Sequence, residues 1–356
     1  MTSRRGFLAG LLATGLAPRA TWADVGAPAF LSAAALADGG YALCGIGRAG
    51  DQLFQIRLPA RGHAAAAHPD RPEAIAFARR PGTFAVVIDC ATGMPMATLN
   101  APAGRHFYGH GVFSQDGRWL FTTENDYAAG QGRVGIWDAM NSYVRAGDIA
   151  SGGIGPHDIK RLPGTDILVV ANGGIDTHPD TGRTPLNIAT MRPNLSYIVD
   201  GQVIETAELP QQWHRNSIRH LAVSARGQVA FGMQWQGKGE APPLVGLHAR
   251  GSTPRIMTAP DAEWRQMQGY IGSIAFAPDD GAVIVTSPRG NMVLGFDVDT
   301  LGWAASLPVM DVCGAAPSGA GVLVSSGTGA LAMVVDGRLV PVGRMDLRWD
   351  NHLVAL

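Results

Sequence analysis

Histidines occupy one recurring position along this chain, at the start of short apolar runs that mostly end in a turn signal. They are His63, His110, His157, His220 and His352. Neutral imidazoles are among the commonest ligands for zinc, copper, iron and nickel. A structural role would explain any one of these histidines, but five in equivalent positions would compete for few buried hydrogen-bond partners. Half of the chain's 10 histidines therefore form a candidate set of metal ligands.

Two further runs begin with a different residue in the same register, Ser273 and Cys313. The seven positions recur at intervals of roughly 40 to 60 residues, which brackets the period of about 40 to 50 residues typical of propeller blades. In a propeller, the first residues of the inner strands meet at one mouth of the central channel. We therefore expect a transition metal at this mouth, with Cys313 as a weaker candidate ligand. A polar or anionic small molecule and a purely structural ring are the alternatives.

The elements that must position these histidines are short strands separated by turns such as Gln115-Asp116-Gly117. After His352 only one strand's length of chain remains, and three strand-like runs (30–37, 41–46 and 52–58) precede His63. We predict an all-β, seven-bladed β-propeller, closed by a blade that the N- and C-termini share, which leaves only short edges exposed. An eight-bladed ring, with 30–37 as an inner strand of its own, is the alternative.

The turns after the second strands should face the same mouth, because two antiparallel strands return the chain there. The residues that we expect around this rim, as contacts to a substrate or an anion, are Arg79, Arg80, Asn125, Asn172, His178, Gln234 and Arg289. His178 lies in a polar insertion that resembles a lid, where capping a turn is its default role. Glu124 is a weaker candidate, either as a metal ligand or as the acceptor that orients an imidazole; the alternative is a solvated turn residue.

The first residues are typical of an export signal. Arg4 and Arg5 precede an apolar run, and Thr21-Trp22-Ala23 supplies a small-residue end, so residues 1–23 are predicted to be a twin-arginine signal peptide. The apolar run is shorter than the roughly 20 residues that a membrane-spanning helix needs. We expect cleavage near Ala23, a mature protein of one propeller domain (24–356) in the periplasm, and no membrane span after cleavage.

Composition and absent motifs exclude several function classes. With 28 basic and 29 acidic residues, the chain has no positive field that would bind nucleic acid. The sequence contains none of the motifs G-x-S-x-G, G-x-x-x-x-G-K-[ST], H-E-x-x-H and C-x-x-C-H, so hydrolase, nucleotide and covalent haem chemistry lack support. Three scattered cysteines are too few for a disulfide framework.

Several segments carry a resemblance to a known family. They are Phe107-Tyr-Gly-His-Gly-Val-Phe-Ser, Thr123-Glu-Asn-Asp, Gly155-Pro-His-Asp, Ala171-Asn-Gly-Gly-Ile, Thr177-His-Pro-Asp, Ser217-Ile-Arg-His-Leu-Ala and Trp349-Asp-Asn-His-Leu. With them, the mature chain resembles an exported bacterial seven-bladed propeller family of unknown function, and more distantly the YVTN-type propellers. Genes of that family often lie near imelysin-like and di-haem peroxidase-like genes, so the resemblance implies periplasmic iron or copper handling.

Three functions follow from these observations. The leading hypothesis is a periplasmic protein that binds iron or copper, with zinc as a further option, and passes the metal to exported metal-handling or redox proteins. The second is a metal-dependent oxidoreductase in which Glu124 carries a proton and arginines hold the substrate. The third is an interaction scaffold without chemistry of its own. The sequence does not decide whether the protein is an enzyme.

Overall fold

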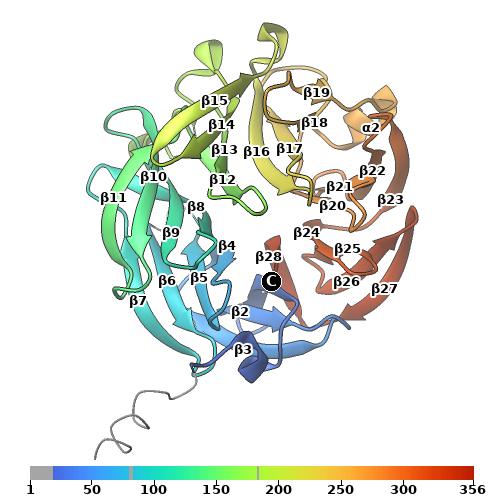
Figure 1. The fold of residues 1–356 in the computed structure, drawn as a ribbon. Coiled ribbons are helices and arrows are strands. Elements are labelled where there is room, and N and C mark those ends of the chain that lie inside the picture. Colours follow the sequence, from blue (N-terminus) through green and yellow to red (C-terminus); the bar gives the residue numbers. More distant parts are fainter. Residues whose placement is uncertain (1–18, 80–82, 183) are drawn as a thin grey trace, which may run out of the picture.

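Seven four-stranded antiparallel sheets surround a common axis, so the chain folds as a seven-bladed β-propeller (Figure 1). The computed structural model describes residues 19–79, 83–182 and 184–356. The seven-bladed ring predicted from the spacing of the histidines is confirmed, and the eight-bladed alternative is wrong. The twin-arginine pair and the apolar run of the predicted signal lie outside the described residues, so export stays a prediction.

Each blade runs from an innermost strand at the axis to an outermost strand at the surface. In that order, four blades are β28 (Leu347–Ala355), β1 (Phe30–Leu36), β2 (Tyr41–Ile46), β3 (Gln52–Leu58); β4 (Gly62–Ala67), β5 (Glu73–Ala78), β6 (Phe84–Asp89), β7 (Met94–Asn100); β8 (Arg105–Phe113), β9 (Trp119–Asp126), β10 (Gln131–Asp138), β11 (Val144–Ala150); and β12 (Pro156–Arg161), β13 (Leu168–Asn172), β14 (Asn194–Val199), β15 (Gln202–Glu208). The other three are β16 (Asn216–Val223), β17 (Val229–Trp235), β18 (Val245–His248), β19 (Arg255–Ile256); β20 (Ser273–Phe276), β21 (Ala282–Ser287), β22 (Met292–Asp297), β23 (Trp303–Pro308); and β24 (Val312–Ser318), β25 (Gly321–Ser326), β26 (Ala330–Val335), β27 (Arg338–Arg344).

The C-terminal strand β28 closes the ring, as predicted from the sequence. Strand β28 pairs antiparallel with β1, so the last strand of the chain completes the sheet that the N-terminus begins. This pairing covers the edge of β1 that would otherwise stay unpaired at the junction. An unpaired strand edge can pair with another chain, which leads to aggregation. The predicted shared blade is therefore confirmed, with β1, β2 and β3 matching the three predicted runs.

Burial follows the position of a strand within its blade. Strands β5 and β25 are buried along their whole length, because neighbouring blades cover both faces of the middle of each sheet. Apart from Glu73 at the start of β5, their residues are correspondingly apolar or small. Outer strands such as β3 and β7 alternate between exposed and half-buried residues, as expected for a strand with one covered face. The core is therefore a ring of contacts between blades, and the polar side chains at the axis stand out against it.

The helical elements are short and lie in connections. They are η1 (Trp22–Val25), η2 (Pro179–Thr181), η3 (Ile188–Thr190), η4 (Gln211–Trp213) and α2 (Asp261–Gln266). In η1, the Trp22 indole N–H donates to the carbonyl of His68 at 2.8 Å, which attaches the N-terminal segment to the second blade. Among the residues that the structure describes, no helix combines the length and the apolar character needed to span a bilayer.

Candidate metal centre

Five imidazoles converge on the propeller axis, each from the innermost strand of a different blade. This histidine cluster consists of His63 on β4, His110 on β8, His157 on β12, His220 on β16 and His352 on β28. Neighbouring ring centroids are 4.6 Å apart for His110 and His352 and up to 6.3 Å apart for His110 and His220. The convergence predicted from the register of the repeats is therefore confirmed, whereas metal binding itself stays a prediction.

A β-bulge accompanies each of these histidines. In β12, the pairing with β13 skips His157, and the other four strands shift register at or beside their histidine. A bulge adds a residue to one strand and redirects a side chain away from the regular alternation. In β20, which begins with Ser273, the pairing is regular throughout. Every strand that points an imidazole at the axis thus carries a bulge, and β24 carries one at Cys313 as well.

Two subsets of the cluster are compact enough to share an ion. They are His63, His110 and His352, and His110, His157 and His220, with the ligand atoms of each subset within 4.8 Å of one another. Small rotations would bring such nitrogens to the distance of about 2.0–2.1 Å at which imidazoles bind zinc. Three protein ligands also leave coordination positions open for water or another ligand. Because His110 belongs to both subsets, it holds the central place in the cluster.

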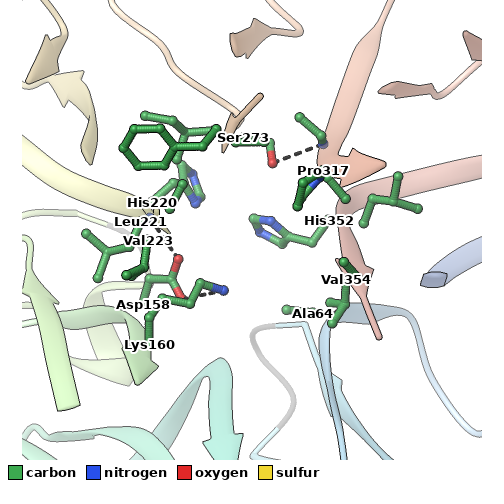
Figure 2. Close-up of a pocket in the computed structure, with 18 of the residues that line it drawn as sticks. Ala64, Asp158, Lys160, His220, Leu221, Val223, Ser273, Pro317, His352 and Val354 are labelled. Atoms are coloured by element: carbon green, nitrogen blue, oxygen red, sulfur yellow. Dashed lines mark hydrogen bonds and ion pairs between the residues drawn. The ribbon is translucent and has the colours of Figure 1, made fainter. Parts of the chain in front are cut away.

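The neighbouring blade orients His110. Its Nδ1 lies 3.1 Å from an Asp158 carboxylate oxygen, so a neutral ring donates there, and its buried Nε2 has no partner in the described chain. Asp158 in turn accepts from the backbone N–H groups of Leu221 and Ile159 at 2.9 and 2.8 Å. Figure 2 shows Asp158 between Lys160 and Leu221. A carboxylate behind an imidazole in this way fixes the tautomer and makes the other nitrogen a better ligand.

The remaining imidazoles present further nitrogens to the axis. His157 donates its Nδ1–H to the carbonyl of Arg219 at 3.0 Å, which leaves Nε2 as the lone-pair nitrogen. Within the described residues, both ring nitrogens of His220 and Nε2 of His352 are buried without a hydrogen-bond partner. His220 and His352 are only 4% and 8% exposed. Buried polar atoms are nearly always satisfied, so a group of unsatisfied nitrogens indicates a ligand.

Burial keeps these imidazoles in the form that binds metals. It lowers the pKa of His220 to about 3, with the charge of His110 adding to the effect. Burial likewise holds the pKa values of His157 and His352 well below the usual range, reinforced by Arg219 at His157 and by His110 at His352. Burial alone would raise the pKa of Asp158, but Lys160 and His110 hold it well below its usual value. His157, His220 and His352 are therefore neutral and Asp158 is ionised at neutral pH.

Gly109 makes room for the His63 ring. Its φ is +100°, a conformation that residues with a side chain rarely adopt. A Cβ at this position would lie 2.4 Å from Cδ2 of His63, which is closer than real Cβ atoms approach. The glycine before His110 in the sequence therefore permits the neighbouring imidazole to reach the axis.

The histidine cluster separates two cavities. One, of about 490 Å³, is lined by His110, His220 and His352 together with apolar side chains of the inner strands (Figure 2). The other, of about 280 Å³, is lined by His63, His157 and His220, and we call it the mouth cavity. An ion held by the cluster would thus be within reach of molecules in either cavity.

The structure corrects two of the weaker ligand candidates. Cys313 belongs to neither metal-sized subset; its thiol is buried, with Sγ 3.1 Å from the Asp311 carbonyl, and burial raises its pKa to about 12. Glu124 lies within β9 rather than in an exposed turn. Its carboxylate is fully buried and pairs with Arg145 at 2.6 and 2.9 Å, and it lines neither of the cavities beside the cluster.

The predicted rim residues divide into three groups. Arg79, Gln234 and Arg289 line the mouth cavity as expected. Asn125 and Asn172 are fully buried within their blades and bonded to neighbouring polar groups, so they do not form the rim. The remaining two are His178, whose Nδ1 accepts from the Asp180 N–H and caps η2, and Arg80, which lies outside the described residues.

The polar insertion reaches the mouth even though His178 does not line it. Ile175, Thr177 and Pro185, all from the β13–β14 connection, contribute to the wall of the mouth cavity. The position predicted for a lid is therefore occupied by this loop.

The residues that support the cluster were not among the sequence-based candidates. Asp158 follows His157, Arg219 precedes His220, and Asn351 precedes His352. Asp158 orients His110, whereas Arg219 and Asn351 line the mouth cavity. A side chain next to a bulged residue can also face the axis, so the polar neighbours of the five histidines were the available signal.

Comparisons with known proteins agree on the fold and leave the chemistry open. The family model described as "Protein of unknown function (DUF1513)" matches residues 56–356. Among solved structures, the chain is similar to hydrazine synthase of Kuenenia stuttgartiensis, with a TM-score of 0.59 at 14% identity over 86% of this chain and 89% of that one. It is also similar to a chain of a mitotic checkpoint complex, with a TM-score of 0.56 at 12% identity over 80% of this chain and 77% of that one. A search of curated proteins found no match. At such low identity, the structural likeness shows the propeller fold alone.

Proposed function

The chain belongs to the DUF1513 family of proteins of unknown function, and we propose from its own histidines that it binds a transition-metal ion on the propeller axis. The observation that carries this proposal is the set of buried imidazole nitrogens, on His110, His220 and His352, that have no hydrogen-bond partner within the described part of the chain. Burying a polar atom without a hydrogen bond costs free energy, and a bound cation recovers that cost.

The surroundings of the cluster support a metal rather than a structural ring. Asp158 fixes the His110 ring through Nδ1 and leaves Nε2 directed elsewhere, and the Arg219 carbonyl does the same for His157. Metal-binding histidines typically have such a partner on the nitrogen away from the metal. A ring that served packing alone would gain more from apolar side chains of similar size than from neutral imidazoles without partners.

The donor set indicates the kind of metal. Imidazole nitrogens suit copper, iron and zinc, whereas magnesium and calcium prefer oxygen ligands. The Cys313 thiol is protonated and belongs to neither metal-sized subset. The proposed ligands are therefore imidazoles alone, without a thiolate. Iron and copper remain the leading candidates for an exported protein of metal handling, with zinc as a further candidate.

The two cavities suggest a transfer role. An ion held between them could be loaded from one side and released to the other, and its recipient would be an exported metal-handling or redox protein. The predicted twin-arginine signal fits such a role, because this pathway exports proteins that have already folded and taken up a cofactor. The compartment and the partner are parts of the proposal.

Metal analysis tests the proposal directly. Protein isolated from the periplasm without refolding should contain about one transition-metal ion, measured by inductively coupled plasma mass spectrometry. The double variant His110→Ala/His157→Ala should contain almost none, whereas His178→Ala, at the exposed cap of η2, should retain the metal. Equal and negligible metal in all three proteins, both as isolated and after incubation with iron, copper or zinc, would contradict the proposal.

A further inference from the structure

The mouth cavity has a one-sided charge. Among the described residues, its lining contains three arginines, Arg79, Arg219 and Arg289, and no aspartate or glutamate. The chain as a whole has no such bias, because it contains 28 basic and 29 acidic residues. A small polar cavity lined by guanidinium groups favours an anion, because Arg binds carboxylate and phosphate oxygens through paired N–H donors.

The three arginines differ in how much of their charge is already balanced. Arg79 donates to the buried carboxylate of Asp350 at 3.0 Å and shares it with Arg61 at 2.8 Å. Arg289 has no carboxylate within salt-bridge distance in the described chain, and its guanidinium lies 4.5 Å from the centroid of the Tyr270 ring. Stacking of this kind holds the plane of the guanidinium while leaving its N–H groups available.

Arg219 brings positive charge to the floor of the cavity. It immediately precedes His220 at the β16 bulge, and its charge contributes, after burial, to the low pKa of His157. An anion that enters the mouth would meet Arg219 and Arg289 in the cavity and the open coordination positions of an ion in the cluster.

We infer that the mouth cavity binds a small carboxylate-bearing anion, of the size of oxalate to citrate, beside the histidine cluster. The anion would bridge Arg219 and Arg289 through its carboxylate oxygens and, when the cluster holds a metal, would complete the coordination of that ion. The volume of about 280 Å³ suits such a molecule and excludes a polymer. The second cavity has mixed charge, because both acidic residues (Asp158 and Asp280) and basic residues (Lys160 and Arg161) line it, and it lacks this preference. The coordination half of this inference rests on the proposed function, whereas binding of the anion to metal-free protein does not.

Titration calorimetry of citrate and oxalate into metal-free protein tests the inference. We expect saturable binding at one site, weakened about tenfold or more by Arg219→Gln and by Arg289→Gln, because each removes a charge-assisted contact. The matched control is Arg226→Gln, which makes the same charge change at an 81% exposed side chain in the turn after β16, and it should bind like the wild type. Inorganic phosphate, which is also anionic but has no carboxylate, should bind more weakly than citrate.

The outcomes separate this inference from the metal proposal. His110→Ala lies outside the lining of the mouth cavity and should keep citrate binding while losing the metal. No saturable citrate or oxalate binding to the wild type would overturn the anion site, as would equal affinity in the Arg219→Gln/Arg289→Gln double variant or stronger binding of phosphate. Citrate binding to a wild-type protein that takes up no metal would support the anion site and contradict the proposed function alone.

Discussion

Among the clusters of titratable side chains in the described part of this propeller, two differ clearly in their hydrogen bonding. The first lies in the blade of β8 to β11, where Glu124 and Asp148 pair with Arg105, Arg133 and Arg145. Every charge there faces an opposite charge. The second is the histidine cluster, where several imidazole nitrogens have no partner in the described chain. In the first cluster Glu124 is buried and the other members are half-buried, and of the two clusters only the histidine cluster has buried side-chain atoms without a partner in the described chain.

This difference separates stability from function. A buried ion pair that is complete contributes specificity to the fold, and removing one member leaves a costly unpaired charge. A cluster of neutral, unsatisfied ligands lowers the stability of the empty protein and rewards the binding of a cation. The polarity of a buried residue therefore identifies neither role, whereas the completeness of its hydrogen bonding distinguishes them.

The largest expected effect is the loss of stability when the ion-pair cluster of β8 to β11 is broken. Glu124→Gln would leave Arg145 with Asp148, which Arg105 and Arg133 already share, so we expect the free energy of unfolding to fall by about 3–5 kcal/mol. Chemical denaturation measures this loss, and Asp38→Asn, in the exposed pair with Arg57, should leave the midpoint unchanged. Metal content should stay at the wild-type level, and its loss in a folded Glu124→Gln protein would assign Glu124 to the metal site after all.

The next largest effect is on metal binding by the histidine cluster. Because His110 belongs to both metal-sized subsets, His110→Ala should weaken metal binding by about a hundredfold or more, whereas His63→Ala, which affects one subset, should weaken it by about tenfold. Competition against a chelator of known affinity measures both values, with His178→Ala as the unaffected control. Equal losses in the two variants would show that the subsets do not share His110.

The two clusters should lose stability in different pH ranges. His220 has a pKa of about 3 when folded against an ordinary 6.5, so the metal-free protein binds fewer protons than the unfolded chain and loses stability as the pH falls from 6.5 toward 3. Between pH 7 and pH 5 one such histidine costs about 2 kcal/mol. Burial alone would raise the pKa of Asp148, but Arg105 and Arg133 lower it to about 2, so its contribution is lost only below about pH 4.

Denaturation curves recorded from pH 8 to pH 3 check these ranges. His220→Gln should flatten the dependence between pH 7 and pH 5 and leave the fall below pH 4 intact. An unchanged slope between pH 7 and pH 5 in this variant would mean that His220 titrates normally in the folded protein.

The smallest expected effect comes from substituting Asp158, the residue that orients His110, and it is a loss of metal affinity. Asp158→Asn removes the charge behind the imidazole and keeps the size of the side chain, so metal affinity should fall by about tenfold. Asp280→Asn changes a carboxylate that lines the same cavity without contacting a histidine of the cluster, and it should bind metal like the wild type. Titration with the metal measures the affinity of both variants. Equal affinities for Asp158→Asn and Asp280→Asn would show that Asp158 does not contribute to metal binding.

The sequence by itself determined the number of blades, the shared closing blade and the five histidines on the axis. These follow from period and register, because each blade repeats one pattern and equivalent positions of a closed ring must meet. The predicted turn positions of Glu124, Asn125 and Asn172 were wrong. Polar residues occur both in turns and at buried strand ends, so polarity alone does not distinguish the two.

Only the tertiary structure decided which polar residues are satisfied. Asp158 reaches His110 across the boundary between two blades, and Glu124 finds its arginines on other strands of its own sheet. The β-bulges that direct the imidazoles inward depend on pairing between strands, which no local pattern encodes. Hydrogen bonding and burial are properties of neighbours brought together by the ring, so the distinction between a structural and a binding cluster exists only once the chain has closed.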